Sequence, residues 1–197
     1  IITFKAYSGC IEETKIAEEY YQIPKGLLTA ISFAESGRTL KNGIKTSWPW
    51  TVNMGGKGKF FPSKKSAINY VKINMKKGKK NIDIGCMQVN MMYHPNAFSS
   101  LEEAFDPQNN VSWAASWLND LKNSHKSWRE ATGYYHSSRP KRKKSYSDKV
   151  FTLWSNLENN KGIKKLAMHN FKNEKLITNI MSAKSSTNNI AISKNPK

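Results

Sequence analysis

Two short segments, about fifty residues apart, place the strongest limits on how this chain can fold. The first is Ala-Glu-Ser-Gly at 34–37, which closes an apolar pattern of helical spacing. Pro24 opens this predicted helix and Gly37 ends it, because proline suits a first turn and glycine suits a helix end. The second is Asp-Ile-Gly-Cys-Met-Gln-Val-Asn at 83–90, which we expect to be extended before it leads into a helix.

Each segment carries one carboxyl group. Glu35 follows Ile31 by four residues, so it lies on or beside the apolar stripe of its helix, where poor solvation raises a carboxyl pKa. Asp83 precedes Gly85, whose missing side chain permits a ligand to approach closely. One protonated acid and one ionised carboxylate are the groups that cleave a glycosidic bond. The pattern therefore indicates such a site, with Glu35 and Asp83 as catalytic residues.

The same residues also have purely structural interpretations. Taken alone, Glu35 fits a salt bridge at a helix end, and Asp83 fits a turn residue that caps the following helix. Gln88 can hydrogen-bond a sugar, or it can be a buried amide that ties two backbone segments together. The sequence leaves these alternatives open.

The remaining pattern predicts a mainly helical domain with one small hairpin. The hairpin is expected from strand-like residues at 48–53, a glycine-rich turn at 55–58 and the aromatic pair that follows. In the first helix, Ile11, Ala17, Tyr20 and Tyr21 are assigned to the apolar side and four glutamates to the polar side. Helices are predicted at 10–21, 24–36, 64–77 with Ser63 as N-cap, 109–121, 128–135 and 146–157, with a basic turn at 139–144.

The charge of the chain restricts its surroundings. Thirty-two basic and fourteen acidic residues give a formal charge of +18, and 57–80 holds nine lysines and no acid. Such an excess implies an anionic partner: nucleic acid, membrane phospholipid or bacterial cell wall. A specific nucleic-acid binder is disfavoured because no binding motif is present and the aromatic residues are not interleaved with the lysines. No apolar run approaches the roughly 18 residues of a membrane span, so no transmembrane segment is predicted.

Cysteine, histidine and the chain ends add four expectations. Cys10 and Cys86, the only cysteines, are compatible with one disulfide in an oxidising compartment or with two buried thiols. Four scattered histidines lack ligand spacing, so neither a metal nor a cofactor is predicted. The first residue is not methionine, which agrees with a removed leader. The composition changes near Asn159, which predicts a catalytic domain at 1–157 and a basic, weakly ordered tail at 158–197.

Three motifs, in order, resemble those of the soluble lytic transglycosylase (SLT) domain, a family of the lysozyme-like superfamily. That family uses Glu-Ser, then Gly-Leu-Met-Gln, then Ala-Tyr-Asn; here the matching stretches are Glu-Ser at 35–36, Gly-Cys-Met-Gln at 85–88 and Tyr-His at 135–136. The resemblance implies an α+β, predominantly α, lysozyme-like fold with a small β-hairpin beside the active-site cleft. The segment between the first two motifs is longer than in compact members, and its hairpin and basic helix are expected to form a lip over the cleft.

The resemblance also assigns roles to residues. Glu35 matches the catalytic acid and base, and Tyr135 matches the tyrosine that contacts the catalytic carboxyl. Cys86 replaces the usual leucine, as in cysteine-bearing relatives, which favours a disulfide with Cys10. Most lytic transglycosylases lack a second carboxylate, whereas the segment around Asp83 is similar to the strand that carries it in animal-type lysozymes. The residues assigned to substrate binding are Ser36, Gly85, Met87, Gln88, Asn90, Tyr135 and His136.

The activity implied by the resemblance is cleavage of the β-1,4 bond between N-acetylmuramic acid and N-acetylglucosamine in peptidoglycan, with formation of 1,6-anhydromuramic acid. Two alternatives stay open: a hydrolytic lysozyme that uses Glu35 and Asp83, and a non-catalytic module that binds the cell wall. The expected location is the periplasm or the exterior of a bacterial cell. A secretion-system or flagellar assembly is a candidate partner.

Overall fold

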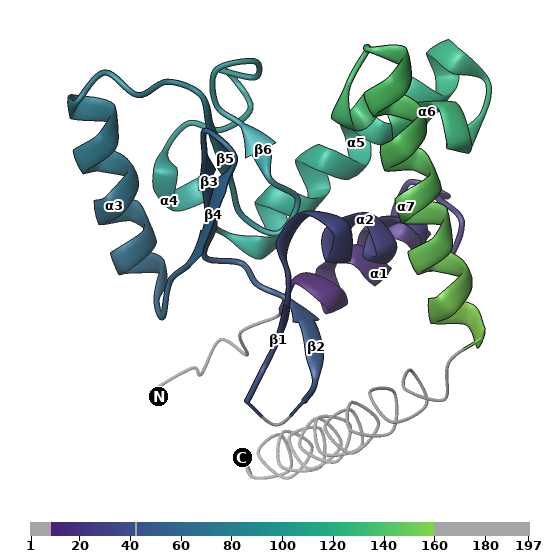
Figure 1. Cartoon of the computed structure of the whole chain (residues 1–197), viewed down its shortest axis with the longest axis horizontal. Coiled ribbons are helices and arrows are strands. Elements are labelled where there is room, and N and C mark those ends of the chain that lie inside the picture. Colours follow the sequence, from purple (N-terminus) through teal and green to yellow (C-terminus); the bar gives the residue numbers. More distant parts are fainter. Residues whose placement is uncertain (1–8, 42, 160–197) are drawn as a thin grey trace, which may run out of the picture. The chain divides into compact units, whose positions relative to one another are not determined.

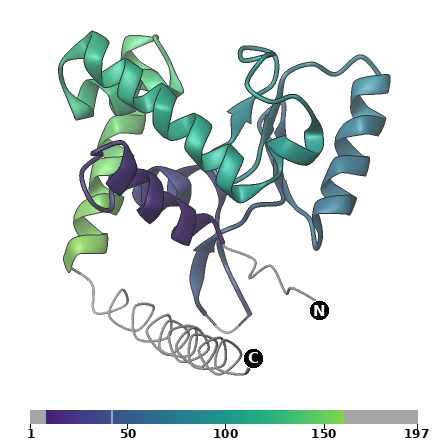
Figure 2. The ribbon, with the colours of Figure 1, turned by 180° about the vertical axis from the view of Figure 1, so that it is seen from behind.

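The computed structural model describes residues 9–41 and 43–159 (Figures 1 and 2). The chain divides into two units, 1–155 and 156–197, and the following paragraphs concern the first. The tail predicted at 158–197 lies outside the described residues from position 160 onward. The helices are α1 (Cys10–Tyr20), α2 (Leu27–Ser36), α3 (Lys64–Lys76), α4 (Leu101–Ala104), α5 (Pro107–His125), α6 (Trp128–His136) and α7 (Pro140–Asn159).

The strands form two antiparallel groups. Their bounds are β1 (Gly37–Thr39), β2 (Lys45–Ser47), β3 (Thr51–Met54), β4 (Lys57–Phe60), β5 (Ile82–Ile84) and β6 (Val89–Asn90). β1 pairs with β2, and the larger sheet has the order β4-β3-β5-β6. The expected hairpin is therefore confirmed as β3–β4. The expectation that 83–90 leads into a helix is wrong: β5 and β6 pair with each other around a tight turn.

The helical core forms around α5, which packs against α1 and α6, while α1 also packs against α2. Helical spacing of small and aliphatic residues explains this arrangement, because α2 and α5 each bury a continuous stripe. Its fully buried side chains include Leu27, Leu28, Ile31, Val111, Ala114, Ala115 and Leu118. None of the described helices combines the length and the apolar content needed to cross a membrane.

The polarity assigned to the first helix was partly wrong. Tyr20 is 78% exposed, whereas Glu18 is buried. The Glu18 carboxylate accepts hydrogen bonds from the backbone N–H groups of Gly26 (2.7 Å) and Thr29 (2.8 Å) at the start of α2. Gly26, the N-cap residue of α2, has no side chain of its own, so a carboxylate from α1 satisfies the free N–H groups instead.

The final helix is longer than predicted. The stretch 139–144, expected to be a basic turn, belongs to α7 from Pro140 onward. Proline is well tolerated in a first helical turn, and the buried residues Tyr146 and Val150 lie one turn apart on the side that faces the core. Helical spacing therefore continues through the charged residues, which simply occupy exposed positions.

Candidate active site

Glu35 lies in the last turn of α2, and its side chain is half-buried. The helix ends there because Gly37 passes against the backbone of Phe33. A Cβ atom at position 37 would lie only 2.3 Å from the Phe33 carbonyl oxygen. Gly37 thus permits the direct turn from α2 into β1, as the sequence predicted, and leaves the Glu35 carboxyl group at the edge of the core.

The surroundings of Glu35 bring its pKa close to neutrality. Burial raises the pKa of the carboxyl group from 4.5 to about 7. The Tyr146 hydroxyl donates a hydrogen bond to Glu35 Oε1 over 2.5 Å, and this bond and the Lys149 ammonium lower the pKa, while the charge of Asp83 raises it. Glu35 therefore exchanges its proton near pH 7, as expected of a group that acts first as acid and then as base.

Asp83 is the middle residue of β5, so it is not the helix cap that the structural alternative suggested. The register places Asn53 of β3 and Asn90 of β6 directly opposite it on either side. Side chains of directly opposite residues share one face of a sheet, so these three polar groups form a row. The Asn90 amide donates to Asp83 Oδ1 over 2.7 Å, and Asn53 Oδ1 is buried with no hydrogen-bond partner in the described part of the chain.

The environments of Glu35 and Asp83 overlap. Burial also raises the pKa of Asp83, and the hydrogen bond from Asn90 opposes that rise. Tyr135 is affected by both carboxyl groups. Its pKa is raised far above 10, mainly by burial, and to a smaller extent by the charges of Glu35 and Asp83. The two carboxyl groups predicted from the sequence therefore lie around the same phenol, one on a helix end and one on a strand.

The turn between β5 and β6 is held in place by buried contacts. Gly85 has φ +86°, and a Cβ atom there would lie 2.5–2.8 Å from the side-chain atoms of Asn110. The Asn110 side chain donates to the carbonyl groups of Ile84 and Ala104 (3.0 Å each) and accepts from the backbone N–H of Met87 (2.9 Å). Only glycine fits this position, because it needs both positive φ and the space that Asn110 occupies.

A disulfide joins this turn to the helical core. Cys10, the first residue of α1, is bonded to Cys86, so the expected pairing is present. The Ser36 hydroxyl, at the end of α2, donates to the Cys86 carbonyl over 2.7 Å. Glu35 is adjacent to Ser36, so the turn is fixed to the helix end that carries the acid.

Several residues predicted to contact substrate instead support the site. Ser36 and Met87 have no exposed surface and Gly85 is buried, so a ligand has little or no access to these three residues in this structure. Asn90 uses its amide on Asp83 and on Asn81, and its oxygen accepts two backbone N–H groups. Together, these four residues hold the β5–β6 turn and the Asp83 carboxylate in position.

Gln88 partly matches the structural interpretation, in which its amide ties two backbone segments together. It has φ +48°, and its Nε2 donates to the carbonyl groups of Thr51 (3.2 Å) and Gly85 (2.9 Å). The amide therefore ties β3 to the turn, as a backbone-linking glutamine would. Its side chain is only half-buried, so the carbonyl oxygen is the part left for a substrate donor.

The tyrosine that hydrogen-bonds the Glu35 carboxyl is Tyr146 of α7, not Tyr135 as the motif suggested. Tyr135 donates instead to the Met87 carbonyl over 2.9 Å, which connects α6 to the β5–β6 turn. His136 is exposed and stacks on Tyr146 with ring centroids 4.4 Å apart. Desolvation, Lys149 and Arg142 lower the pKa of His136.

Sequence reasoning missed Tyr146, Lys149 and Asn53. Tyr146 precedes the buried Val150 by four residues, so helical spacing could have placed it on the core side of α7. Lys149 donates to the Ala34 carbonyl over 3.0 Å, next to Glu35, and no motif marks it. Asn53 depends on strand register, which the sequence does not specify.

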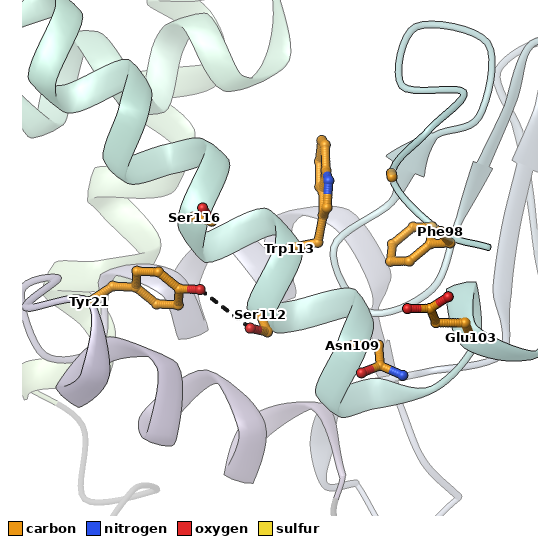
Figure 3. Close-up of a pocket in the computed structure, with 8 residues that line it drawn as sticks. Tyr21, Phe98, Glu103, Asn109, Ser112, Trp113 and Ser116 are labelled. Atoms are coloured by element: carbon orange, nitrogen blue, oxygen red, sulfur yellow. Dashed lines mark hydrogen bonds between the residues drawn. The ribbon is translucent and has the colours of Figure 1, made fainter. Parts of the chain in front are cut away.

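A separate pocket of about 320 Å³ beside α5 is lined by residues that include Tyr21, Phe98, Glu103 and Trp113 (Figure 3). The Tyr21 and Ser112 hydroxyls are 3.5 Å apart at its margin. Neither Glu35 nor Asp83 lines this pocket. Among the described residues, no group of three His, Cys, Asp or Glu side chains is arranged to hold a metal ion.

Comparison with known proteins agrees with the geometry. The family model described as "Transglycosylase SLT domain" matches residues 12–151, which includes Glu35, Asp83, the β5–β6 turn and Tyr146. No curated protein and no solved structure showed significant similarity to this chain.

Proposed function

Because this chain belongs to the transglycosylase SLT domain family, we propose that it cleaves the β-1,4 bond between N-acetylmuramic acid and N-acetylglucosamine and releases 1,6-anhydromuramic acid. The observation that carries this proposal is Glu35, a half-buried carboxyl group with a pKa raised by burial to about 7. The family indicates the substrate class, peptidoglycan, and the geometry supports Glu35 as the group that performs the chemistry.

In the proposed reaction, protonated Glu35 donates its proton to the glycosidic oxygen as the bond to the muramic C1 breaks. The substrate's own N-acetyl oxygen, or the Asp83 carboxylate, stabilises the positive charge that develops at C1. Glu35, now ionised, removes the proton from the muramic 6-hydroxyl, whose oxygen attacks C1 and closes the anhydro ring. Glu35 ends protonated, so one residue serves as acid and then base without net consumption of a proton.

A hydrolytic lysozyme is the second candidate, and Asp83 is the observation that favours it. A carboxylate that is held by Asn90 and shares its surroundings with the acid is suited to stabilise or capture the sugar cation until water arrives. In that mechanism, water rather than the 6-hydroxyl takes the position at C1. The two candidates therefore use the same acid and differ in the nucleophile.

Mass spectrometry of the soluble fragments from digested peptidoglycan separates these reactions. We expect fragments that end in 1,6-anhydromuramic acid, and a loss of at least about 10³-fold in rate for Glu35→Gln. Fragments with reducing muramic ends, about 18 Da heavier by the added water, would establish the lysozyme. A Glu35→Gln rate within tenfold of the wild type would remove Glu35 from the mechanism.

Asp83→Asn tests the second carboxylate in the same assay. The variant keeps the shape of the side chain and loses the charge, so we expect a smaller loss than for Glu35→Gln if the N-acetyl group of the substrate provides most of the stabilisation. A loss as large as that of Glu35→Gln would favour the lysozyme mechanism. An unchanged rate would reduce Asp83 to a structural residue of β5.

We propose that the protein acts in the periplasm or outside the cell. The disulfide between Cys10 and Cys86 supports this location, because such bonds persist in oxidising compartments. Binding to a secretion-system or flagellar assembly stays a prediction from the resemblance. Thiol labelling of protein isolated from the cell envelope tests this location, because it measures the oxidation state of the two cysteines. Free thiols at Cys10 and Cys86 would argue against the proposed location.

A further inference from the structure

The part of the chain that contains the sheet carries a large excess of positive charge. Between Glu35 and Glu102 the sequence contains twelve lysine and arginine residues and a single acid, Asp83. More than half of the net charge of +18 therefore falls in one third of the chain. The proposed catalytic carboxylate is the one negative group in this stretch.

Five of these lysines lie on two segments that lead to one end of the larger sheet, the start of β4 and the connection from the end of α3 to β5. Met54 pairs with Lys57 on one side and with Ile82 on the other, so the start of β4 and the start of β5 lie at the same end. The segment that follows α3 returns to that end, at the top of Figure 1. We call the five lysines on these two segments the lysine end: Lys57, Lys76, Lys77, Lys79 and Lys80.

Within the described residues, no acidic side chain forms an ion pair with the lysine end. Elsewhere on α3, Lys64 and Lys72 form ion pairs with Asp106 (4.0 Å) and Glu102 (3.2 Å). All five members of the lysine end are exposed, and none forms an ion pair within residues 9–41 and 43–159. Unpaired charges of one sign create a positive potential at the surface, which attracts an anionic ligand.

The lysine end is close in sequence to the row formed by Asn53, Asp83 and Asn90. Asp83 follows Lys80 by three residues, or about 10 Å along an extended strand. Between them, the Asn81 side chain accepts a hydrogen bond from Asn90 over 2.6 Å, and Asn90 also holds Asp83. A ligand that contacts Asp83 and extends toward the start of β5 therefore reaches the lysines.

We propose that the lysine end binds the carboxylate groups of the peptide stems on a glycan strand bound at Glu35 and Asp83, and so selects peptidoglycan whose stems are anionic. This inference rests on the proposed function and names the part of the substrate that the lysine end recognises. A single-stranded nucleic acid is the competing polyanion, but the segments 54–57 and 76–82 contain no aromatic side chain on which bases stack.

Binding tests the inference without turnover. Each protein carries Glu35→Gln and is sedimented with insoluble peptidoglycan whose amines are acetylated and whose carboxyl groups are either intact or converted to amides. Lys79→Gln with Lys80→Gln removes two charges from the lysine end. The matched control, Lys41→Gln with Lys45→Gln, removes two exposed charges from the β1–β2 hairpin.

With intact carboxyl groups, we expect the Lys79/Lys80 variant to bind about threefold to tenfold more weakly than its parent, the range for two exposed ion pairs. The control should change affinity by less than twofold. On amidated peptidoglycan, parent and variant should agree within twofold, and 0.5 M salt should remove the difference on the intact material.

Equal losses for the two double variants, or a Lys79/Lys80 loss that persists on amidated peptidoglycan, would overturn the inference. It would also fall if the Lys79/Lys80 variant lost affinity for a DNA oligonucleotide and not for peptidoglycan. Fragment analysis with the wild-type protein reports separately on the proposed function, so cleavage of peptidoglycan without these lysine effects would refute the inference alone.

Discussion

Glu35→Gln should make this protein more stable at neutral and alkaline pH. The pKa of Glu35 is about 7 in the folded state, against 4.5 as the ordinary value. Between these two pH values the folded state binds a proton more readily than the unfolded state does, so the stability contributed by Glu35 is lost as the pH rises. Glutamine keeps the shape of the side chain and cannot ionise.

The magnitude follows from the pKa difference. Each pKa unit corresponds to about 1.4 kcal/mol, so ionisation of Glu35 in the folded protein lowers the free energy of unfolding by about 3 kcal/mol in total. That loss is absent below pH 4.5, develops between pH 4.5 and 7, and is complete above pH 7. The Gln variant should therefore gain about 3 kcal/mol on the wild type between pH 4 and pH 8.

Urea denaturation of both proteins at pH 4, 5, 6, 7 and 8 provides the measurement. The quantity compared is the difference in the free energy of unfolding, because contributions shared by the two proteins cancel in it. Glu19→Gln, which makes the same change at an exposed position of α1, is the control. A Glu35→Gln difference that varies by less than about 1 kcal/mol over this range would refute the argument.

Two further changes test the supports of the site. Tyr146→Phe removes the hydrogen bond that lowers the pKa of Glu35, so the pH at which kcat/KM falls on the alkaline side should rise. The expected rise is about one pH unit, because a hydrogen bond to a charged group is worth about 1.5 kcal/mol. An unchanged pH profile would contradict this role of Tyr146. Replacing both Cys10 and Cys86 by serine should lower the free energy of unfolding by about 4 kcal/mol, because the disulfide closes a loop with a sequence separation of 76. Urea denaturation with and without reductant checks that value, and a loss below 1 kcal/mol would contradict it.

Local signals allowed much of the fold to be predicted. Ser63 caps α3 with a capping box, and Asp106 followed by Pro107 opens α5, as expected from residues that prefer helix starts. The turn from α2 at Gly37 was also predicted, because glycine is the usual residue where a chain leaves a helix sharply. Each of these features depends on residues that are close in sequence.

Features that depend on distant residues could not be predicted. Tyr146 and Glu35 are 111 positions apart, and only the packing of α7 beside α2 brings the hydroxyl to the carboxyl group. Glu18 was assigned to solvent because a glutamate usually avoids burial, yet the free N–H groups of α2 bind it in the interior.

The row formed by Asn53, Asp83 and Asn90 is a second feature of this kind. It requires the register of three strands, and a slip of one residue would turn Asp83 to the opposite face of the sheet. The sequence thus identified both carboxyl groups, and the structure was needed to identify the groups that hold them.

The contact between Gly85 and Asn110 also limits how this site can change during evolution. Any side chain at position 85 collides with Asn110, and a smaller residue at position 110 leaves the Met87 N–H and two backbone carbonyl groups without their partner. Each single change therefore costs stability, and a change of both residues does not remove the cost at position 85, where φ is +86°. The two positions should therefore stay fixed together in descendants of this protein even where the surrounding loop diverges.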